Sequence, residues 1–328
     1  MNKFENIYMV CPPNTETGGP EACHQLIGEM SKLGIKANLI YYKKKKTLNN
    51  LRGRLDQSIR EDTIITPNTR APVPKAYECY EAPFTDTIVD SANNLLILPE
   101  NLLHLIHIGK NIKKGIWWLS VDNALLAISR LGSIPMLRSK VMHFYQSDYA
   151  RQFLELLSLE NSFPLSDYIS EKISSYKDES VPRDKFVVYN PKKGIEYTKK
   201  VIQSFPELQF VPLIDMTKDQ VYQTLNKASL YIDFGDHPGK DRIPREAALL
   251  GCCVITSRNG SAKNLKDVFI PEEFKFEKKE DNLKVIGESM ISCIENFPDQ
   301  TIKFNDYRAE ICREKNIFID EIKSAFTN

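Results

Sequence analysis

The stretch Ser229–Ala262 reads SLYIDFGDHPGKDRIPREAALLGCCVITSRNGSA, and it decides the fold. Its apolar run Leu230–Phe234 predicts a buried parallel strand. Gly235 ends that run, and Pro244 suits the first turn of the helix that follows. The next strand is predicted at Val254–Thr256. The order strand, charged loop, helix, strand indicates an open α/β sheet.

The loop between that strand and that helix predicts a binding site for an anion. In an open α/β sheet, a loop at the carboxyl end of a strand faces the ligand crevice. The helix N-terminus there offers free amides and a positive partial charge. Gly239, Lys240, Arg242 and Arg245 add a flexible backbone and formal positive charge at the same place. We therefore expect a phosphate-bearing ligand; the competing interpretation is a solvated loop before an ordinary helix.

The same alternation of strands and helices fills the rest of the chain. Apolar runs and helical periodicity predict two doubly wound, Rossmann-like parallel sheets, with the ligand in a cleft between them. The polar stretch Ser170–Arg183 predicts the connector, so we expect one domain over residues 1–175 and a second over 176–305. The further strands are predicted at Ile7–Cys11, Ala37–Tyr41, Thr63–Thr66, Leu95–Pro99, Ile116–Val121, Val141–Gln146, Leu165–Ile169, Lys185–Tyr189, Gln209–Leu213 and Phe274–Phe276.

Composition excludes several classes of protein. The 328 residues carry a formal net charge of +1, which gives no global reason to bind nucleic acid. The seven cysteines form no Cys-x-x-Cys pair, so a reduced, cytoplasmic compartment fits best. The N-terminus does not read as a signal peptide, and no apolar stretch reaches the ~20 residues of a membrane span.

Two short stretches leave alternatives open. Gly18-Gly19 follows the first predicted strand, where paired glycines allow a close approach to a ligand or simply form a tight turn. The four lysines Lys43, Lys44, Lys45 and Lys46 read as a solvated loop or as a patch that meets anionic lipid at the inner face of a membrane.

Taken together, these features resemble a GT-B glycosyltransferase, most closely the family-four type. Gly18-Gly19 resembles the loop that faces the donor diphosphate there, and Asn190–Gly194 (NPKKG) resembles the family's basic phosphate loop. Arg245–Ile255 (REAALLGCCVI) is similar to the family's Glu-Ala-x-x-x-Gly-x-Pro-Val segment, and Asn259–Ala262 to the glycine turn after it. The resemblance also implies a final helix, residues 306–328, that crosses back to the first domain.

The resemblance implies roles for individual residues. Glu246 would hold the nucleotide ribose, and no Asp-x-Asp metal signature is present, in agreement with catalysis that needs no metal or other cofactor. The developing charge of the leaving diphosphate must then meet cations and backbone amides. The candidates for this part of the site are Gly18, Gly19, Lys192, Lys193, Gly239, Lys240, Arg242 and Arg245.

The catalytic assignment is the point at which the chain departs from the family. Family-four enzymes carry a second glutamate eight residues before the ribose glutamate, and this chain has Pro238 there. Asp236, His237 and Asp241 are candidates to replace it. Glu100 and Asp122 each follow a predicted strand and are candidates for a general base, which an inverting enzyme needs and a retaining one does not.

The expected function is transfer of a sugar from a nucleotide diphosphate sugar to a glycan or lipid-linked acceptor. By resemblance, the product is a bacterial surface polysaccharide. Two alternatives remain: a sugar-nucleotide epimerase of the same fold, and a glycosyltransferase-like partner that binds the nucleotide without turnover. Pro238 is the feature that keeps the second alternative open.

Overall fold

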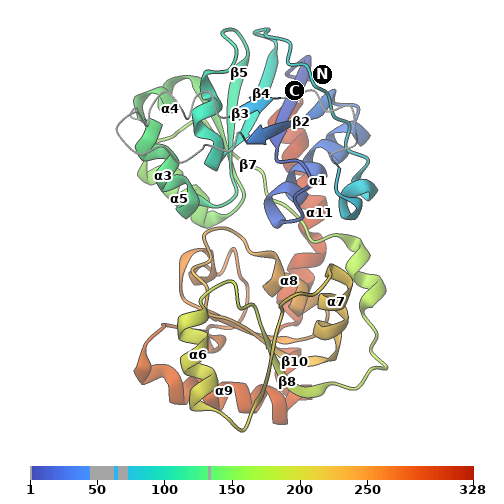
Figure 1. Ribbon diagram of the computed structural model, residues 1–328, viewed down its shortest axis with the longest axis vertical. Helices are drawn as coiled ribbons and strands as arrows, with labels where there is room; N and C mark the ends of the chain where they lie inside the picture. Colours follow the sequence, from blue (N-terminus) through green and yellow to red (C-terminus); the bar gives the residue numbers. More distant parts are fainter. Residues whose placement is uncertain (1, 45–62, 66–72, 132–133) are drawn as a thin grey trace. The chain divides into compact units, whose positions relative to one another are not determined.

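The computed structural model describes residues 2–44, 63–65, 73–131 and 134–328 and divides into two compact units (Figure 1). The first unit comprises Met1–Asp167 together with Asn316–Asn328, and the second comprises Tyr168–Lys315. The connector predicted from the polar stretch lies wholly within the second unit. The last helix of the chain contributes to both units, its final residues belonging to the first.

The first unit is built on a seven-stranded sheet with the order β3-β2-β1-β4-β5-β6-β7. All neighbouring strands are parallel except the edge pair β2 and β3. The strand order reverses between β1 and β4, which is the place where open α/β sheets bind ligands. The strands are β1 (Asn6–Cys11), β2 (Ala37–Lys44), β3 (Thr63–Ile65), β4 (Asn94–Pro99), β5 (Lys113–Trp118), β6 (Val141–Tyr145) and β7 (Ser162–Pro164).

Helices cover both faces of this sheet because its strands are apolar on both sides. Trp118 packs with the helices of one face, and its neighbour Trp117 stacks on Phe318 from the other. Glu321 from the same helix accepts a 2.7 Å hydrogen bond from the amide of Ser166, which anchors the end of that helix on the unit. The helices are α1 (Gly18–Lys32), α3 (Val121–Leu131), α4 (Ile134–Lys140), α5 (Asp148–Leu156), the end of α11 (Asn305–Phe326), and the 3-10 helices η1 (Lys75–Tyr80) and η2 (Glu100–His107).

The second unit is built on a five-stranded, fully parallel sheet with the order β12-β11-β10-β8-β9. The predicted class of two doubly wound, parallel α/β sheets is therefore confirmed. Every residue of the central strand β10 is buried, as its apolar run predicts. The strands are β8 (Asp184–Tyr189), β9 (Gln209–Pro212), β10 (Ala228–Asp233), β11 (Cys253–Ser257) and β12 (Lys275–Phe276).

The helices of the second unit also lie on both faces (Figure 1). Helix α9 contacts β8, β10 and α6, while α7 and α8 contact each other and β10. A capping box formed by Thr217 and Gln220 starts α7. The helices are α6 (Ile195–Ser204), α7 (Lys218–Lys227), α8 (Arg242–Leu249), α9 (Leu283–Glu295), α10 (Phe297–Ile302), most of α11, and the short η3 (Glu171–Tyr176), η4 (Gly260–Lys263), η5 (Glu272–Phe274) and η6 (Glu280–Asn282).

Apart from shifted strand ends, two predicted elements differ in the structure. The strand expected at Leu165–Ile169 lies earlier, at Ser162–Pro164, because the apolar residues after it are buried in irregular backbone. Gly18 and Gly19 are the first two residues of α1 and not the end of a loop. The side chain of Thr17, at the N-cap, makes no capping hydrogen bond, so it leaves the first amides of α1 to other partners.

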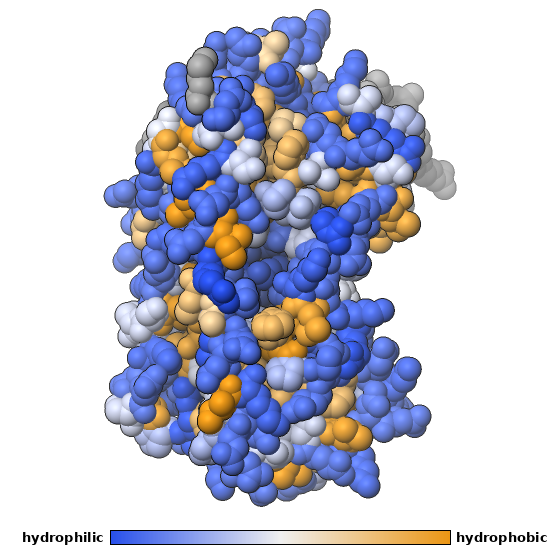
Figure 2. Space-filling model, turned by 180° about the vertical axis from the view of Figure 1, so that it is seen from behind, coloured by the Kyte–Doolittle hydropathy of each residue, from blue (hydrophilic) through white to orange (hydrophobic). Residues whose placement is uncertain are grey.

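On the face in Figure 2, hydrophobic residues (orange) form separate patches among hydrophilic ones (blue). Within residues 2–44, 63–65, 73–131 and 134–328, no helix has the length and apolarity needed to cross a bilayer. Strand β2 ends at Lys44, and the predicted lipid patch at Lys43–Lys46 lies largely outside the described residues, so it stays a prediction.

Candidate functional site

In the second unit, the strand order reverses between β8 and β10, so the loops after these two strands flank the expected ligand crevice. The loop after β8 is Asn190–Gly194, and the loop after β10 is residues 234–241. Most of the residues selected from the sequence lie in these two loops and in the first turns of α8. The two loops are far apart in the sequence. They lie side by side in the fold because β8 and β10 pair in parallel.

Glycines allow the loops to approach closely. Gly194 has a φ of +58°, and a β-carbon there would lie 2.0 Å from the carbonyl oxygen of Phe234. Gly260, from the predicted turn after β11, has a φ of +49°, and its β-carbon would lie 2.0 Å from the carbonyl oxygen of His237. Since no real β-carbon tolerates such distances, only glycine fits either position without displacement.

Serines of the neighbouring segment fix the loop after β10. Ser257 Oγ donates a 2.5 Å hydrogen bond to the carbonyl of Gly235, and Ser261 Oγ donates a 2.7 Å bond to the carbonyl of Gly239. The amide of Ser261 donates to the carbonyl of His237 over 2.9 Å. The loop is therefore held along its length before any ligand arrives.

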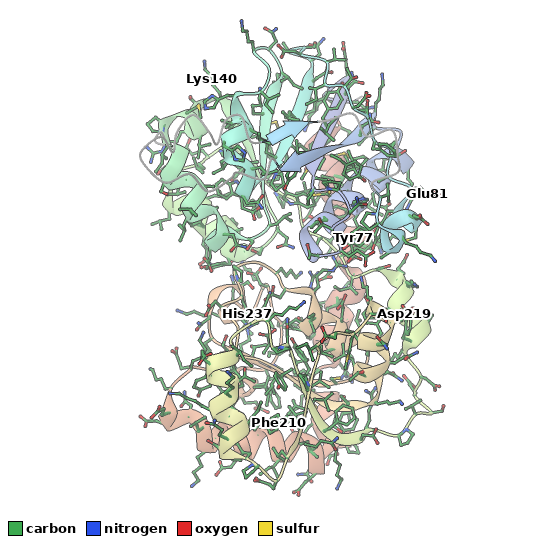
Figure 3. All side chains as sticks on the ribbon, viewed as in Figure 1. Tyr77, Glu81, Lys140, Phe210, Asp219 and His237 are labelled. Atoms are coloured by element: carbon green, nitrogen blue, oxygen red, sulfur yellow. The ribbon has the colours of Figure 1, made fainter. Side chains whose placement is uncertain are left out.

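His237, labelled in Figure 3, is fully buried in this loop. It lies between the carboxylates of Asp233 and Asp241. Its Nδ1 is 3.0 Å from Asp241 Oδ2. Its Nε2 is 3.3 Å from the carbonyl oxygen of Asp233 and 3.7 Å from Asp233 Oδ1. Burial lowers the pKa of His237, but Asp233 and Asp241 outweigh burial and raise the pKa above its usual 6.5. The geometry therefore favours the imidazolium form.

Asp241 links His237 to the other loop. Its second carboxylate oxygen, Oδ1, pairs with Lys193 Nζ from the loop after β8. Burial raises the pKa of Asp241, but the hydrogen bond with His237 and the charge of Lys193 outweigh it and hold the pKa below its usual value. Asp233 in turn accepts hydrogen bonds from Tyr231 Oη and the amide of Gly235, each with a length of 2.9 Å.

Asp233, His237 and Asp241 also have the residue types of a metal site, with one ligand atom from each within 4.8 Å of the others. Both ring nitrogens of His237 already face an acceptor, and Asp241 is shared with Lys193. A cation would have to displace the histidine proton or the lysine. The donor set therefore fits a cluster bridged by protons better than an open cation site.

Glu246 lies one turn into α8 and is 5% exposed. Its Oε1 accepts a 3.0 Å hydrogen bond from Tyr222 Oη. Lys218 Nζ and Arg242 Nε each lie 4.0 Å from the same oxygen. An ionised carboxylate has about four lone-pair sites, so this environment leaves capacity for hydroxyl donors from a ligand.

Two of the selected cations have a partner that local sequence signals did not identify. Lys240 Nζ lies 2.7 Å from Glu314 Oε1, and Arg245 Nη1 lies 2.8 Å from Glu314 Oε2. Arg245 is fully buried and also donates to the carbonyl oxygens of Lys240 and Asp241. These contacts fasten the start of α8 to α11. Lys192, in contrast, is exposed.

In the first unit, Glu100 follows β4 at the strand-order reversal and is 4% exposed. Its Oε2 accepts a 3.0 Å hydrogen bond from the amide of Leu119, just after β5. Burial raises the pKa of Glu100 to about 7, with backbone hydrogen bonds opposing the shift. Asp122, in the first turn of α3, accepts a 2.8 Å hydrogen bond from Tyr149 Oη. The two carboxylates thus have different local partners.

Three residues of the site were not selected from the sequence. Asp233 lies inside the predicted apolar strand Leu230–Phe234, and Tyr222 lies on a helix with no local signal of a site. Glu314 lies 69 residues after Arg245, its partner in the fold. An acidic residue ending an otherwise apolar strand was the one local signal available, and it pointed to Asp233 alone.

Comparison with solved structures gives the fold. The chain aligns with TarM with a TM-score of 0.66 at 9% identity, covering 96% of this chain and 97% of that one. The Anabaena protein HepE in complex with UDP-glucose gives 0.61 at 11%, covering 98% of both chains. Sucrose-phosphate synthase from Thermosynechococcus elongatus gives 0.56 at 12%, covering 98% and 95%.

Coverage is smaller in one further comparison: with S. aureus TarM in complex with UDP, the alignment spans 71% of this chain and 55% of that one. Searches with protein-family models and among curated proteins gave no match. The solved neighbours are GT-B glycosyltransferases, as the sequence resemblance implied. Two parallel α/β units in the described residues, aligned with those proteins along nearly the whole chain, show that this protein has the GT-B fold.

Proposed function

We propose that this protein is a metal-independent glycosyltransferase whose donor is a nucleotide diphosphate sugar. The observation that carries the proposal is the meeting of the loops after β8 and β10 at the strand-order reversal, where the Lys193–Asp241 ion pair joins them. HepE has been solved with UDP-glucose and S. aureus TarM with UDP, and both share this fold.

Glu246 is proposed to hold the nucleotide ribose. It is placed at the second turn of α8, close to the crevice loops, and Tyr222 holds one of its oxygens in a fixed position. A carboxylate oriented in this way accepts hydrogen bonds from two neighbouring ribose hydroxyls. Because its surroundings already bury it, the ligand hydroxyls replace little water on binding.

Lys193, Lys192 and Arg242 are proposed to stabilise the leaving diphosphate. An ammonium group has three donors, so Lys193 can bond phosphate oxygens while it remains paired with Asp241. The amides near Gly239 and those of Gly18 and Gly19 in the first turn of α1 are the proposed backbone donors. Lys240 and Arg245, which pair with Glu314, are assigned to support of the loop in this proposal.

For the acceptor side, we propose a glycan or a lipid-linked sugar of bacterial surface polysaccharide synthesis, handled in the cytoplasm at the membrane face. This part rests on the resemblance to the family-four type. Glu100 has a pKa near the working pH, which suits a general base, although its hydrogen bond to Leu119 gives it a structural task as well. Asp122 is the second candidate.

A non-catalytic nucleotide-binding partner is the second candidate function. Pro238 supports it, since that position carries a glutamate in the family-four type. Both functions require nucleotide binding, so binding measurements test what the two share and turnover separates them.

The test begins with thermal shift of the full chain against UDP, GDP, CMP, TDP and ADP, each with and without EDTA. A ligand at ~100 times its Kd adds ~2.7 kcal/mol to the free energy of unfolding. We expect one nucleoside diphosphate to stabilise the protein equally in both conditions. Hydrolysis or transfer assays with its sugar conjugates then distinguish an enzyme from a binding partner.

Variants assign the binding to the proposed site. Glu246→Gln should weaken binding of the nucleotide that stabilises the wild-type protein. Glu288→Gln, at an exposed position of α9, should leave that binding unchanged. If no nucleotide shifts the melting temperature of the wild-type protein, the proposal is wrong. If EDTA abolishes the shift, the metal-independent part of the proposal is wrong.

A further inference from the structure

The buried histidine of the loop after β10 has an unusual backbone. His237 has a φ of +48°, in the left-handed region that non-glycine residues adopt at a cost. Its side chain contacts an acceptor through each ring nitrogen, and its carbonyl is held by Ser261. Such a conformation persists only where the surroundings fix it, and it often marks a functional position.

The contacts of His237 form a continuous path to the other crevice loop. The path runs from Asp233 at the end of β10, through His237, to Asp241 at the N-cap of α8, and from there to Lys193 after β8. Asp241 thus uses one oxygen for the histidine and the other for the lysine. The lysine is the only member of this path that is more than one third exposed, with 38% of its side chain open to solvent.

The charges of this path balance only when His237 carries a proton. Two carboxylates then face an imidazolium and an ammonium, and the sum is zero. With a neutral histidine, a buried cluster with one excess negative charge would lie beside the position proposed for a diphosphate. Other charged or titratable groups near His237 include Asp236, which pairs with Lys278, and Tyr231, which donates to Asp233. Arg245 Nε donates to the carbonyl oxygen of Asp241.

We propose that His237 is a positioning residue of the donor site: as an imidazolium it bridges Asp233 and Asp241, and through Asp241 it holds the Lys193 ammonium in place for the donor diphosphate. This inference rests on the proposed function. It assigns His237 and Asp241 to positioning, in place of the catalytic role that the sequence suggested. Lys193 contacts the diphosphate, and His237 acts through it.

The test measures Kd by titration calorimetry for UDP, for uridine and for inorganic pyrophosphate. His237→Asn should raise the Kd for UDP and for pyrophosphate about 10-fold to 100-fold, the range expected for the loss of one charge-assisted contact. The Kd for uridine should stay unchanged. Lys193→Met should do the same. Because His237 acts through Lys193, the double variant should be no weaker than Lys193→Met alone.

Two further measurements separate charge positioning from a general loss of structure. Asp233→Asn in the His237→Asn background removes the excess negative charge and should recover much of the lost affinity for UDP. In the wild-type protein, the affinity for pyrophosphate should fall as pH rises through the pKa of His237. That pKa lies above its usual 6.5, because the two facing carboxylates raise it by more than burial lowers it. His237→Asn should show no such fall.

Each contrary outcome has a distinct meaning. Additive effects of the two single variants, or equal weakening of uridine, would overturn the positioning role. Pyrophosphate binding that is lost in EDTA, to the same extent in the wild-type protein and in His237→Asn, would overturn it as well. Pyrophosphate binding without binding of any of the five screened nucleotides contradicts the proposed nucleotide donor, and the pyrophosphate titrations of the variants then decide the path from His237 to Lys193. If the wild-type protein binds neither, both proposals fail.

Discussion

Arg245 Nη1 lies 2.8 Å from Glu314 Oε2, and both side chains are buried although 69 residues separate them in the sequence. The other oxygen of Glu314 lies 2.7 Å from Lys240 Nζ. One carboxylate of α11 therefore pairs with two cations at the start of α8. The position of the crevice loop after β10 depends on this long-range contact.

Glu314→Gln should destabilise the second unit. The amide keeps the shape of the side chain but removes the negative charge that pairs with the buried Arg245, and breaking a buried ion pair in this way costs about 3–5 kcal/mol. Denaturant unfolding of the full chain measures the loss. Glu310→Gln on the same helix is the matched control, because Glu310 is 46% exposed and its pairing with Arg313 contributes at most about 1 kcal/mol. Equal losses of unfolding free energy in the two variants would contradict a stabilising role for the pairing of Glu314 with Arg245 and Lys240.

Local sequence signals were sufficient for most of the sheets. Apolar runs mark buried parallel strands: the predicted Ala37–Tyr41 lies within β2, and the predicted Lys185–Tyr189 lies within β8. Strand β5 begins at Lys113, three residues before the predicted Ile116, because two lysines at its start hide an otherwise buried strand. The edge strand β7 was misplaced because its half-exposed residues carry less apolar signal than the buried coil after it.

The candidate site likewise has features that the sequence predicts and features that it does not. The loops and their cations were predictable because glycine, proline and lysine mark them locally. Their pairings were not: Lys193 with Asp241, and Lys240 and Arg245 with Glu314, join residues 48 to 74 positions apart. Such pairings follow from strand order and helix packing, which no local pattern contains. Whether a given cation is available to a ligand or committed to the fold therefore required the structure.

Gly260→Ala should displace the loop after β10. The new methyl group would lie 2.0 Å from the carbonyl oxygen of His237, and the positive φ adds its own cost of about 1 kcal/mol. Gly34→Ala is the control, because Gly34 also has a positive φ, +71°, but no atom within 4 Å of a β-carbon. We expect Gly260→Ala to lose about 1–3 kcal/mol more stability than the control, and to weaken UDP binding. The measurements are denaturant unfolding and calorimetric titration, and similar results for the two variants would count against the packed-loop description.

Glu100→Gln should change how stability depends on pH. The pKa of Glu100 is raised from 4.5 to about 7, so between these values the folded state retains a proton that the unfolded state has lost. Stability of the wild-type protein therefore falls as pH rises from 4.5 to 7, by up to about 3 kcal/mol from this group. The glutamine keeps an acceptor for the amide of Leu119 and does not titrate. It should remove this part of the decline and be the more stable form above pH 7, as measured by unfolding at a series of pH values.

Lys275 should make stability rise with pH in the alkaline range, opposite to the effect of Glu100. Its side chain is fully buried on β12, with Nζ 3.5 Å from the carbonyl oxygen of Asn264 and 4.0 Å from Glu272 Oε1. Burial lowers its pKa from 10.5 to about 8, against the opposing charge of Glu272. Between these values the unfolded state binds a proton that the folded state has lost, so stability rises with pH, by up to about 3 kcal/mol.

Lys275→Met should therefore be more stable than the wild-type protein at pH 7 and should lack this rise between pH 8 and 10.5. The methionine fills a similar volume without a charge to desolvate. Lys284→Met on α9, where the side chain is 87% exposed, supplies the control and should change stability by less than about 0.5 kcal/mol at either pH. A loss of stability at pH 7 in Lys275→Met alone would mean that the contacts with Glu272 and Asn264 outweigh the burial of the charge.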